Sequence, residues 1–351
     1  MTSYTAIHLA ERPTDNIVPG KTFTAKQHPI PDAASLQDGE VLFKTLYLSL
    51  DPAMRGWLKD RRSYLPPVQI GQVMRGMGVG LIVASRAKGF PVGSYATGGC
   101  NWSEYAVLNP DKPDQSLQSL DLPRGAVPTD ALGVLGMTAL TAYFGMLDVG
   151  QVKEGDFVVV SAAAGATGSV AGQIAKIQGA RVLGLAGGGD KVRWLKEELG
   201  FDDALDYKDP DFKKKFREAT KDLIDVYFDN VGGEILDMAL AQAKPHARFV
   251  ECGAISEYNK EKPGGIKNYT VIIPMRIRMQ GFIILDYRER YGEARKQLAQ
   301  WLSEGKLKRK ETVVKGGLSQ AESALLGLFR GQNTGKMMVE VARSEDAGAK
   351  L

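Results

Sequence analysis

Residues 157–178 read FVVVSAAAGATGSVAGQIAKIQ, and this stretch decides the fold. Its first five residues are an apolar run typical of a buried strand, and a helical pattern follows directly. Ala162, Gly165 and Gly168 form AxxGxxG, a variant of the dinucleotide-binding fingerprint. Small residues let the backbone approach a pyrophosphate, and the helix start presents its N–H groups to the negative charge. The stretch therefore predicts a nucleotide site more strongly than plain helix–strand packing.

The chain downstream of this turn alternates strands and helices at the spacing of βαβ units. We expect further strands at 181–186, 204–207, 223–229, 247–252 and 279–286, and helices at 132–146, 168–178, 190–199 and 291–302. About six strands joined by right-handed crossovers make a doubly wound parallel sheet.

The first third of the chain is rich in short strands, expected at 41–50, 79–83 and 103–108, and fits a small barrel or sandwich. Gly76, Gly78 and Gly80 form a second glycine string there, but it leads into a strand, so tight barrel packing explains it better. A late strand–helix–strand pattern at 312–314, 321–329 and 336–341 indicates a strand returned to the first domain. We predict one domain of residues 1–128 and 310–351, and another of residues 129–309.

The composition is that of a soluble globular protein, with 351 residues, 44% of them hydrophobic and 25% charged. No stretch approaches the roughly 20 apolar residues of a membrane helix. The first residues, MTSYTAIHLAERPTDN, lack the apolar run of a secretory signal. The net charge of +4 is mild and its basic residues are interleaved with acids. We therefore expect no membrane and no nucleic-acid partner.

The cysteines and histidines are few and scattered: Cys100, Cys252, His8, His28 and His246. Two cysteines cannot form a disulfide framework in a chain of this size, which fits a reducing compartment. A structural zinc site takes four closely spaced Cys or His ligands, and that spacing is missing. We predict no bound metal.

The end of the second expected strand bears on the choice of cofactor. NAD-dependent enzymes place an acid there to bind the ribose 2′-OH, whereas this chain has three glycines, 187–189. Asp190 comes slightly late and suits a helix N-cap. Lys191 and Lys208 are cations available to a 2′-phosphate. The pattern favours NADP, although an exposed first-turn lysine is the ordinary alternative for Lys191.

Several long motifs lie in one order along nearly the whole chain: LYLSLDPAMRG (from Leu46), GQVMRGMGVG, GMTALTAYFG, VVSAAAGATGS, AGGGDKV, YFDNVGGE, CGAISEYN and RMQGFIILD. Together they resemble the zinc-independent medium-chain dehydrogenase/reductases, in the branch of prostaglandin and alkenal double-bond reductases that includes curcumin reductase. The resemblance implies a GroES-like β-barrel domain and a Rossmann domain. It also implies NADPH-dependent reduction of the carbon–carbon double bond of α,β-unsaturated ketones and aldehydes.

The resemblance also implies a set of cofactor-binding residues. The pyrophosphate turn is Gly165, Ala166, Thr167 and Gly168, the 2′-phosphate lysine is Lys191, and the adenosine-side tyrosine is Tyr207. Asn230 is the asparagine at a strand end, and Asn333 is the contact from the C-terminal return. Two segments line the nicotinamide: Cys252, Gly253, Ala254, Ile255 and Ser256, and Phe282, Ile283 and Ile284. Strand-end and turn chemistry is the ordinary alternative for the two asparagines.

Two positions depart from the pattern of that branch. The family motif DPYMR has an aromatic residue where this chain has Ala53, which leaves a roomier wall if the position faces substrate. Gly188 replaces a serine, which removes one hydroxyl donor to the 2′-phosphate. The first departure leaves the substrate open, and the second weakens the preference for NADP without reversing it.

Reduction of an enone places negative charge on the carbonyl oxygen, and a tyrosine hydroxyl is a suitable donor to it. Tyr258 is the first candidate and Tyr47 the second, while Tyr64 lies in a Pro-rich loop that could border the site. Tyr47 could instead be a core residue of its strand, and Tyr258 could hold its loop or the nicotinamide ribose. Other activities stay open: a quinone reductase, an alcohol or carbonyl oxidoreductase, or a non-catalytic nucleotide-binding protein.

The expected partner is a small enone or enal substrate, and the protein itself is expected to be a homodimer or a monomer. The expected compartment is the cytoplasm. The alternative is the peroxisome, because the last residues, Ala349, Lys350 and Leu351, resemble the Ser-Lys-Leu address.

Overall fold

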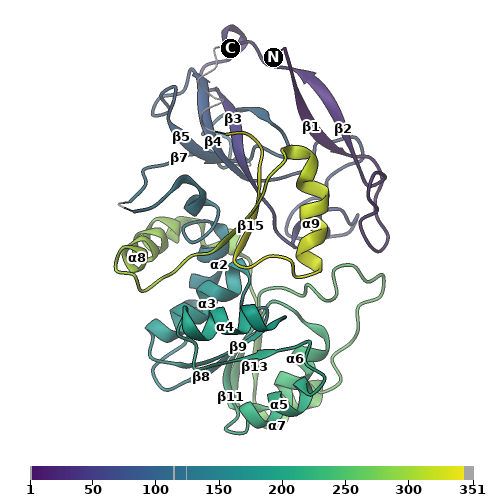
Figure 1. Cartoon of the computed structure of the whole chain (residues 1–351), viewed down its shortest axis with the longest axis vertical. Helices are drawn as coiled ribbons and strands as arrows, with labels where there is room; N and C mark the ends of the chain where they lie inside the picture. Colours follow the sequence, from purple (N-terminus) through teal and green to yellow (C-terminus); the bar gives the residue numbers. More distant parts are fainter. Residues whose placement is uncertain (1, 114, 124, 344–351) are drawn as a thin grey trace. The chain divides into compact units, whose positions relative to one another are not determined.

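The computed structural model describes residues 2–113, 115–123 and 125–343, so the tripeptide that resembles a peroxisomal address lies outside the described residues. The chain divides into two compact units. The first unit combines Met1–Leu132 with Glu311–Leu351, and the second is Gly133–Lys310. Figure 1 colours the chain by sequence, so the two segments of the first unit appear in purple to blue and in yellow.

The second unit contains a six-stranded sheet in the order β10-β9-β8-β11-β12-β13. All five strand pairs are parallel. The strands are β8 (Phe157–Val160), β9 (Arg181–Ala186), β10 (Asp203–Asp206), β11 (Ile224–Asp229), β12 (Ala243–Glu251) and β13 (Arg278–Gly281). This is the predicted doubly wound sheet, and the strand order reverses direction between β8 and β11. Strand β8 consists of Phe and Val residues because it is covered on both faces.

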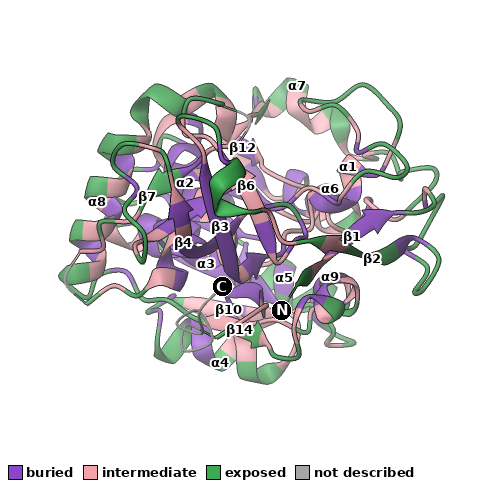
Figure 2. Cartoon of the chain, turned by 90° about the horizontal axis from the view of Figure 1, so that it is seen from above, coloured by how far each residue is buried: buried purple, intermediate pink, exposed green. Residues whose placement is uncertain are grey.

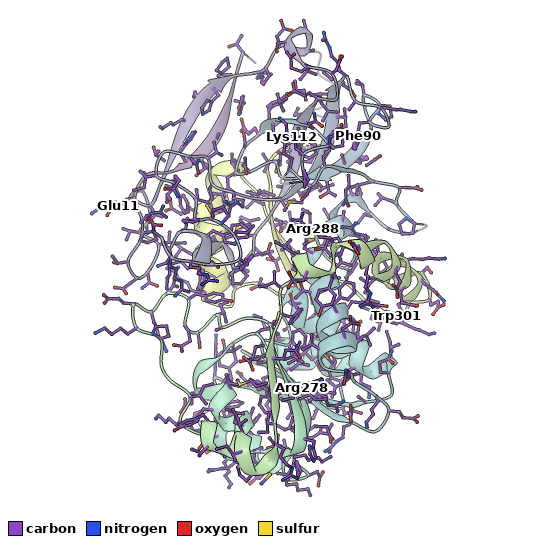
Figure 3. The ribbon with its side chains drawn as sticks, turned by 180° about the vertical axis from the view of Figure 1, so that it is seen from behind. Glu11, Phe90, Lys112, Arg278, Arg288 and Trp301 are labelled. Atoms are coloured by element: carbon purple, nitrogen blue, oxygen red, sulfur yellow. The ribbon has the colours of Figure 1, made fainter. Side chains whose placement is uncertain are left out.

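The helices of the second unit are α2 (Met137–Phe144), α3 (Ala166–Ile177), α4 (Gly189–Glu197), α5 (Phe212–Ala219), α6 (Gly233–Leu240), α7 (Ile272–Met275) and α8 (Tyr291–Ser303). Apolar side chains of the strands pack with those of α5 and α6 into one core that includes Val159, Phe216, Tyr227, Leu240 and Phe249. Figure 3 labels Trp301 of α8, whose ring lies 6.0 Å from that of Tyr143 in α2.

Two expected elements of this unit differ from the structure by more than a shift of a few residues. The strand predicted at 279–286 ends at Gly281, and a 3-10 segment, η5 (Ile284–Arg290), follows it. The reason is aromatic packing: Tyr287 of η5 stacks on Phe144 with 4.4 Å between ring centroids. The helix predicted at 132–146 begins only at Met137 and continues into a π-helical turn, η3 (Gly145–Val149).

The first unit is built on a sheet in the order β14-β15-β3-β4-β5-β7, with β6 paired to β3. Its strands are β3 (Val41–Ser49), β4 (Gly78–Ser85), β5 (Tyr95–Gly98), β6 (Tyr105–Leu108), β7 (Gln118–Ser119), β14 (Glu311–Val314) and β15 (Lys336–Glu340). Strands β1 (Ser3–Leu9) and β2 (Phe23–Pro29) form an antiparallel pair that the sequence analysis did not predict. Figure 2 shows β3 and β4 in the colour of buried residues.

The C-terminal strand returns to the first unit as expected, because β15 pairs antiparallel with β3. The short helices of this unit are α1 (Met54–Trp57) and α9 (Ala321–Phe329). The glycine string that runs into β4 serves close packing, since a Cβ atom on Gly80 of this strand would lie 2.0 Å from the Lys44 carbonyl oxygen. Among the described residues, no helix combines the length and the apolar character needed to cross a membrane.

Candidate functional site

The glycine turn lies where the sequence predicts it, between β8 and α3. Gly165 is the N-cap of α3, and its N–H donates to the Ala162 carbonyl oxygen at 2.9 Å. A Cβ atom on Gly168 would lie 2.4 Å from that same oxygen, so the turn closes only around glycine. The helix begins at Ala166, two residues before the predicted start. The N–H groups of Ala166, Thr167 and Gly168 belong to its first turn, which has no partners within the helix.

The loops after β9 and β10 are held together by a carboxylate that sequence reasoning missed. Asp206 Oδ1 accepts bonds from the backbone N–H groups of Gly188 and Lys208, at 2.9 Å each. The Tyr207 ring packs on the same loop, since a Cβ atom on Gly187 would lie 2.8 Å from it. The sequence does contain a signal for Asp206: an Asp at the end of a strand often accepts a bond from the backbone N–H two residues later, which is an Asx turn.

Lys191, in the first turn of α4, lies half-buried beside this loop. Burial lowers the pKa of Lys191, and the positive charge of Lys208 lowers it further. Two like charges close together attract an anion such as a phosphate. Asp190 is not the N-cap as predicted, because Gly188, with φ +101°, takes that position, and Asp190 pairs with Arg193.

A buried hydrogen-bond network joins β8 to β11 at the point where the strand order reverses. Ser161 Oγ donates to Asp229 Oδ1 at 2.8 Å, and Asn230 N donates to Ser161 Oγ at 2.8 Å. The Asn230 side-chain amide donates to the Ser161 carbonyl oxygen at 2.8 Å. Asp229 also accepts bonds from the N–H groups of Val231 and Gly232. Burial raises the pKa of Asp229 above its ordinary value, although these donors oppose the shift.

The segment after β12 is anchored to the same network. The N–H groups of Cys252 and Gly253 donate to the Asp229 carbonyl oxygen, at 3.0 Å each. The Tyr258 hydroxyl turns back on its own segment and accepts a bond from the Ala254 N–H at 3.1 Å. A tyrosine hydroxyl that accepts a bond can still donate its hydrogen. Burial raises the pKa of the Cys252 thiol to about 12, so this thiol stays protonated.

The middle of this segment follows the loop after β11. Ile255 N donates to the Asn230 carbonyl oxygen at 3.1 Å. Ser256 donates to the Val231 carbonyl oxygen with its N–H at 3.1 Å and its hydroxyl at 2.7 Å. The two loops at the carboxyl ends of β11 and β12 therefore form one hydrogen-bonded layer.

The second segment predicted at the nicotinamide leaves the sheet after β13. A Cβ atom on Gly145 would lie 2.8 Å from the Phe282 ring, so the ring fits here because residue 145 has no side chain. Ile283 is extended, with φ −125°, and the Ile284 carbonyl oxygen accepts a bond from the Tyr291 hydroxyl at 2.9 Å. The segment thus comes from the edge of the sheet beyond β12.

Two tyrosines of interest belong to the first unit. Tyr47 lies in β3, paired in register with Glu340 of β15, and it packs against apolar core residues. Burial raises the pKa of Tyr47, and the carboxylates of Glu340 and Glu311 add to the shift. The Tyr64 side chain is 45% exposed, and its hydroxyl accepts a bond from Trp57 Nε1 at 3.0 Å.

Asn333 also belongs to the first unit, in the turn that precedes β15. Its side-chain amide donates to the Gly335 carbonyl oxygen at 2.8 Å, which is turn chemistry. Its contact with a cofactor stays a prediction, as does any role of Tyr47 in catalysis. Ala53, where the family motif has an aromatic residue, is the half-buried N-cap of α1.

The structure therefore brings the predicted residues of the second unit to the carboxyl edge of one parallel sheet, where open α/β sheets bind ligands. Sequence reasoning missed Ser161, Asp206 and Asp229, which hold that edge together. In the described part of the chain, no three His, Cys, Asp or Glu side chains are grouped so that they could hold a metal ion.

The chain is similar to known proteins along nearly its whole length. Residues 5–115 match the N-terminal domain of oxidoreductases, and residues 166–303 match the zinc-binding dehydrogenase model. It is 40% identical to the NADPH-dependent curcumin reductase of Escherichia coli, over 95% of this chain and 96% of that protein. It is 39% identical to the NADP(+)-dependent 2-alkenal reductase of Nicotiana tabacum, over 87% and 88% respectively.

A solved structure agrees with these matches. The crystal structure of CurA from Vibrio vulnificus in complex with NADPH is 40% identical in sequence and has a TM-score of 0.88. The alignment covers 97% of this chain and 99% of that one. With these relatives and the two-unit architecture, the chain belongs to the medium-chain dehydrogenase/reductase family, in the branch of the NADP-dependent curcumin, prostaglandin and alkenal reductases.

Proposed function

We propose that this protein is an NADPH-dependent reductase of the carbon–carbon double bond in α,β-unsaturated ketones and aldehydes. The observation that carries the proposal is the Lys191–Lys208 pair, which lies in the first turn of α4 and in the turn after β10, on the same edge of the sheet as the Gly165 turn. This arrangement suits a dinucleotide with an additional phosphate. Relatives that share about 40% of the sequence are named as NADPH-dependent reductases of curcumin and alkenals.

The residues of the second unit fit NADPH in three places. The first turn of α3 would bind the pyrophosphate, because its N–H groups lack intrahelical partners and the helix dipole favours an anion. Lys191 and Lys208 would hold the 2′-phosphate, and the 41% exposed Tyr207 ring would contact the adenosine. Gly188 offers no hydroxyl to that phosphate, so its recognition depends mainly on the two lysines.

The loops after β11 and β12 would position the nicotinamide. When bound, NADPH supplies a hydride to the β-carbon of the enone. The chain's own contribution is a donor to the substrate carbonyl oxygen, where negative charge develops. We assign this donor to the Tyr258 hydroxyl, whose oxygen is already oriented by the Ala254 N–H. Tyr47 is the second candidate.

The two units would have different roles, one in binding the cofactor and the other in binding the substrate. We propose that residues 129–309 form the dinucleotide-binding domain, and that residues 1–128 and 310–351 form the substrate domain. The absence of an aromatic ring at Ala53 would leave space for a bulkier enone than the family motif admits. We expect a homodimer or a monomer, which sedimentation velocity would distinguish.

The test is a panel of neutral enones, quinones and simple alcohols, each followed by consumption of NADPH or reduction of NADP. We expect the protein to reduce enones much faster than quinones and not to oxidise alcohols. A quinone preference would favour the quinone reductases of the same family. NADPH binding without turnover of any substrate would indicate a nucleotide-binding protein that is not an enzyme.

The compartment is a separate proposal. We expect the protein in the cytoplasm, with the peroxisome as the alternative because of its last three residues. A fluorescent protein ending in these residues should stay diffuse, and punctate staining that coincides with a peroxisomal marker would place the protein there.

A further inference from the structure

Two carboxyl groups end two neighbouring strands of the second unit. Asp229 is the last residue of β11 and Glu251 the last of β12, and the two are partners in the parallel register. Register partners place their side chains on the same face of a sheet. Tyr227, two residues before Asp229, shares that face, and its hydroxyl donates to Asp229 Oδ1 at 3.2 Å.

The surroundings of the two carboxyl groups differ sharply. Asp229 is fully buried but accepts bonds from Ser161, Tyr227, Val231 and Gly232, which suits a carboxylate. Glu251 Oε1 is shielded from solvent and has no hydrogen-bond partner among the described residues. Glu251 as a whole is half-buried. A charged carboxylate is costly where one of its oxygens is shielded and has no donor, whereas a neutral carboxylic acid is far less so.

The two strands beside β12 and the next residue of the chain show which ionisable groups lie near Glu251. From β11 it faces the carboxylate of Asp229 and the hydroxyl of Tyr227, and the next residue of its own chain is the thiol Cys252. On β13 its register partner is Gly281, which has no ionisable group. Arg278, labelled in Figure 3, lies at the opposite end of β13 and donates to the Val149 carbonyl oxygen. The charge that acts on the pKa of Glu251 is the negative charge of Asp229.

Burial, together with the charge of Asp229, raises the pKa of Glu251 to about 8. The proton on Glu251 is thus present at neutral pH and is lost as the pH rises through that value. Below it one negative charge lies at the ends of β11 and β12, and above it there are two. Like charges side by side repel, so they favour separation of the two strand ends.

We propose that Glu251 is a positioning residue that keeps the two cofactor loops together only while it is protonated, and so sets an alkaline limit to nicotinamide cofactor binding. The loops concerned begin at Asn230 and at Cys252, directly after the two carboxyl residues. Cys252 and Gly253 donate to the carbonyl oxygen of Asp229 itself, so separation of the strand ends disturbs these bonds first. The inference rests on the proposed NADPH site.

Lys191 is a second ionisable group to separate in the experiment, because burial and the charge of Lys208 lower its pKa from the ordinary lysine value. Loss of its charge weakens recognition of the 2′-phosphate, which NADH lacks. Binding of NADH therefore isolates the contribution of Glu251, and comparison with NADPH shows what Lys191 adds.

The experiment measures the Kd of NADH and of NADPH by fluorescence, between about pH 6.5 and pH 9.5, for the wild type and Glu251→Gln. Glu197→Gln, which removes a carboxylate from the exposed face of α4, is the control. We expect the Kd of NADH to rise about tenfold with pH in the wild type and the control, and to stay constant in Glu251→Gln. An equal rise in Glu251→Gln, or a constant Kd in the wild type, overturns the proposal.

A second measurement needs neither a variant nor a cofactor. In wild-type protein labelled with ¹³C at the glutamate carboxyl carbons, one glutamate resonance should titrate near pH 8. If every glutamate resonance has completed its titration by about pH 6, the inference fails even when NADPH binds normally. Conversely, a resonance that titrates as expected in a protein that binds no NADPH would contradict the proposed function and leave the protonation of Glu251 intact.

Discussion

At the residue scale, we propose that the charge of Lys191 determines the preference for NADPH over NADH. If Lys191 binds the 2′-phosphate, its replacement by alanine removes a charge-assisted contact worth about 1.5–3 kcal/mol. We expect the KM for NADPH to rise by roughly 10- to 100-fold while kinetics with NADH barely change. Steady-state kinetics with each cofactor measure this.

The control is Lys196→Ala on the same helix, because Lys196 forms an exposed ion pair with Asp203. Its kinetics should match the wild type. Equal losses with NADPH and NADH in the Lys191 variant would contradict the assignment of this lysine to the 2′-phosphate.

Tyr258 carries the second prediction at this scale. If its hydroxyl stabilises charge on the substrate oxygen, Tyr258→Phe should lower kcat by about 100-fold, the lower end of what a lost oxyanion donor costs. The KM for the enone should change little, since the contact strengthens only in the transition state. Full turnover with weaker NADPH binding would instead make Tyr258 a ribose anchor, and Tyr47 would become the candidate donor.

Some site residues could be predicted from sequence and others could not, for a physical reason. The position of the Gly165 turn could be predicted because its signal is local, namely small residues after an apolar strand. The role of Lys191 rests on another local signal, the missing acid at the end of a strand, and stays a prediction. Ser161 and Asp229 work through a bond between residues 68 positions apart in the chain. Such a contact exists only once β8 and β11 are neighbours.

At the scale of elements, the turn between β8 and α3 leaves no room for a side chain at Gly168. A Cβ atom on Gly168 would lie 2.4 Å from the Ala162 carbonyl oxygen and 2.9 Å from the Cα of Ala163, both backbone atoms. Gly168→Ala must open the turn, so we expect at least tenfold weaker NADPH binding and a loss of about 1–3 kcal/mol in the free energy of unfolding. Titration with NADPH and urea unfolding measure the two effects.

The matched control is Gly292→Ala in α8, where a Cβ atom meets nothing within 4 Å. An alanine inside a helix stabilises it by about 0.5–1 kcal/mol relative to glycine. Wild-type NADPH affinity in Gly168→Ala would mean that the turn does not bind the pyrophosphate.

Elements with strong periodicity matched their prediction closely. The strand at 181–186 and the helix at 321–329 have the predicted bounds. The predicted strand at 279–286 was wrong beyond Gly281, because stacking of Tyr287 on Phe144 overrides the β propensity of the apolar residues that follow. Packing partners of this kind are invisible in a local pattern.

At the scale of the whole molecule, Glu251 should also make stability depend on pH. Its folded-state pKa is raised from 4.5 to about 8, so the stability it contributes is full below pH 4.5 and is lost as the pH rises through about 8. Glu251→Gln keeps a neutral side chain at every pH. We therefore expect the free energy of unfolding of the variant to rise relative to that of the wild type as the pH increases, by about 2–4 kcal/mol once the pH exceeds the folded-state pKa of Glu251.

Urea unfolding at pH 5 and pH 9 measures this gain. Glu197→Gln should differ from the wild type by the same small amount at the two pH values, because that carboxylate is exposed. A gain for Glu251→Gln that does not grow with pH would mean that Glu251 is ionised in the folded protein at neutral pH.

The most direct test of the proposed function follows the transferred hydrogen. The protein is incubated with a neutral enone and NADPH that carries deuterium at nicotinamide C4, with the two C4 epimers tested separately, and the product is analysed by NMR. We predict a saturated ketone with deuterium on its β-carbon from one epimer. Deuterium on the carbinol carbon of an allylic alcohol, or a product without deuterium from either epimer, would contradict double-bond reduction by hydride transfer.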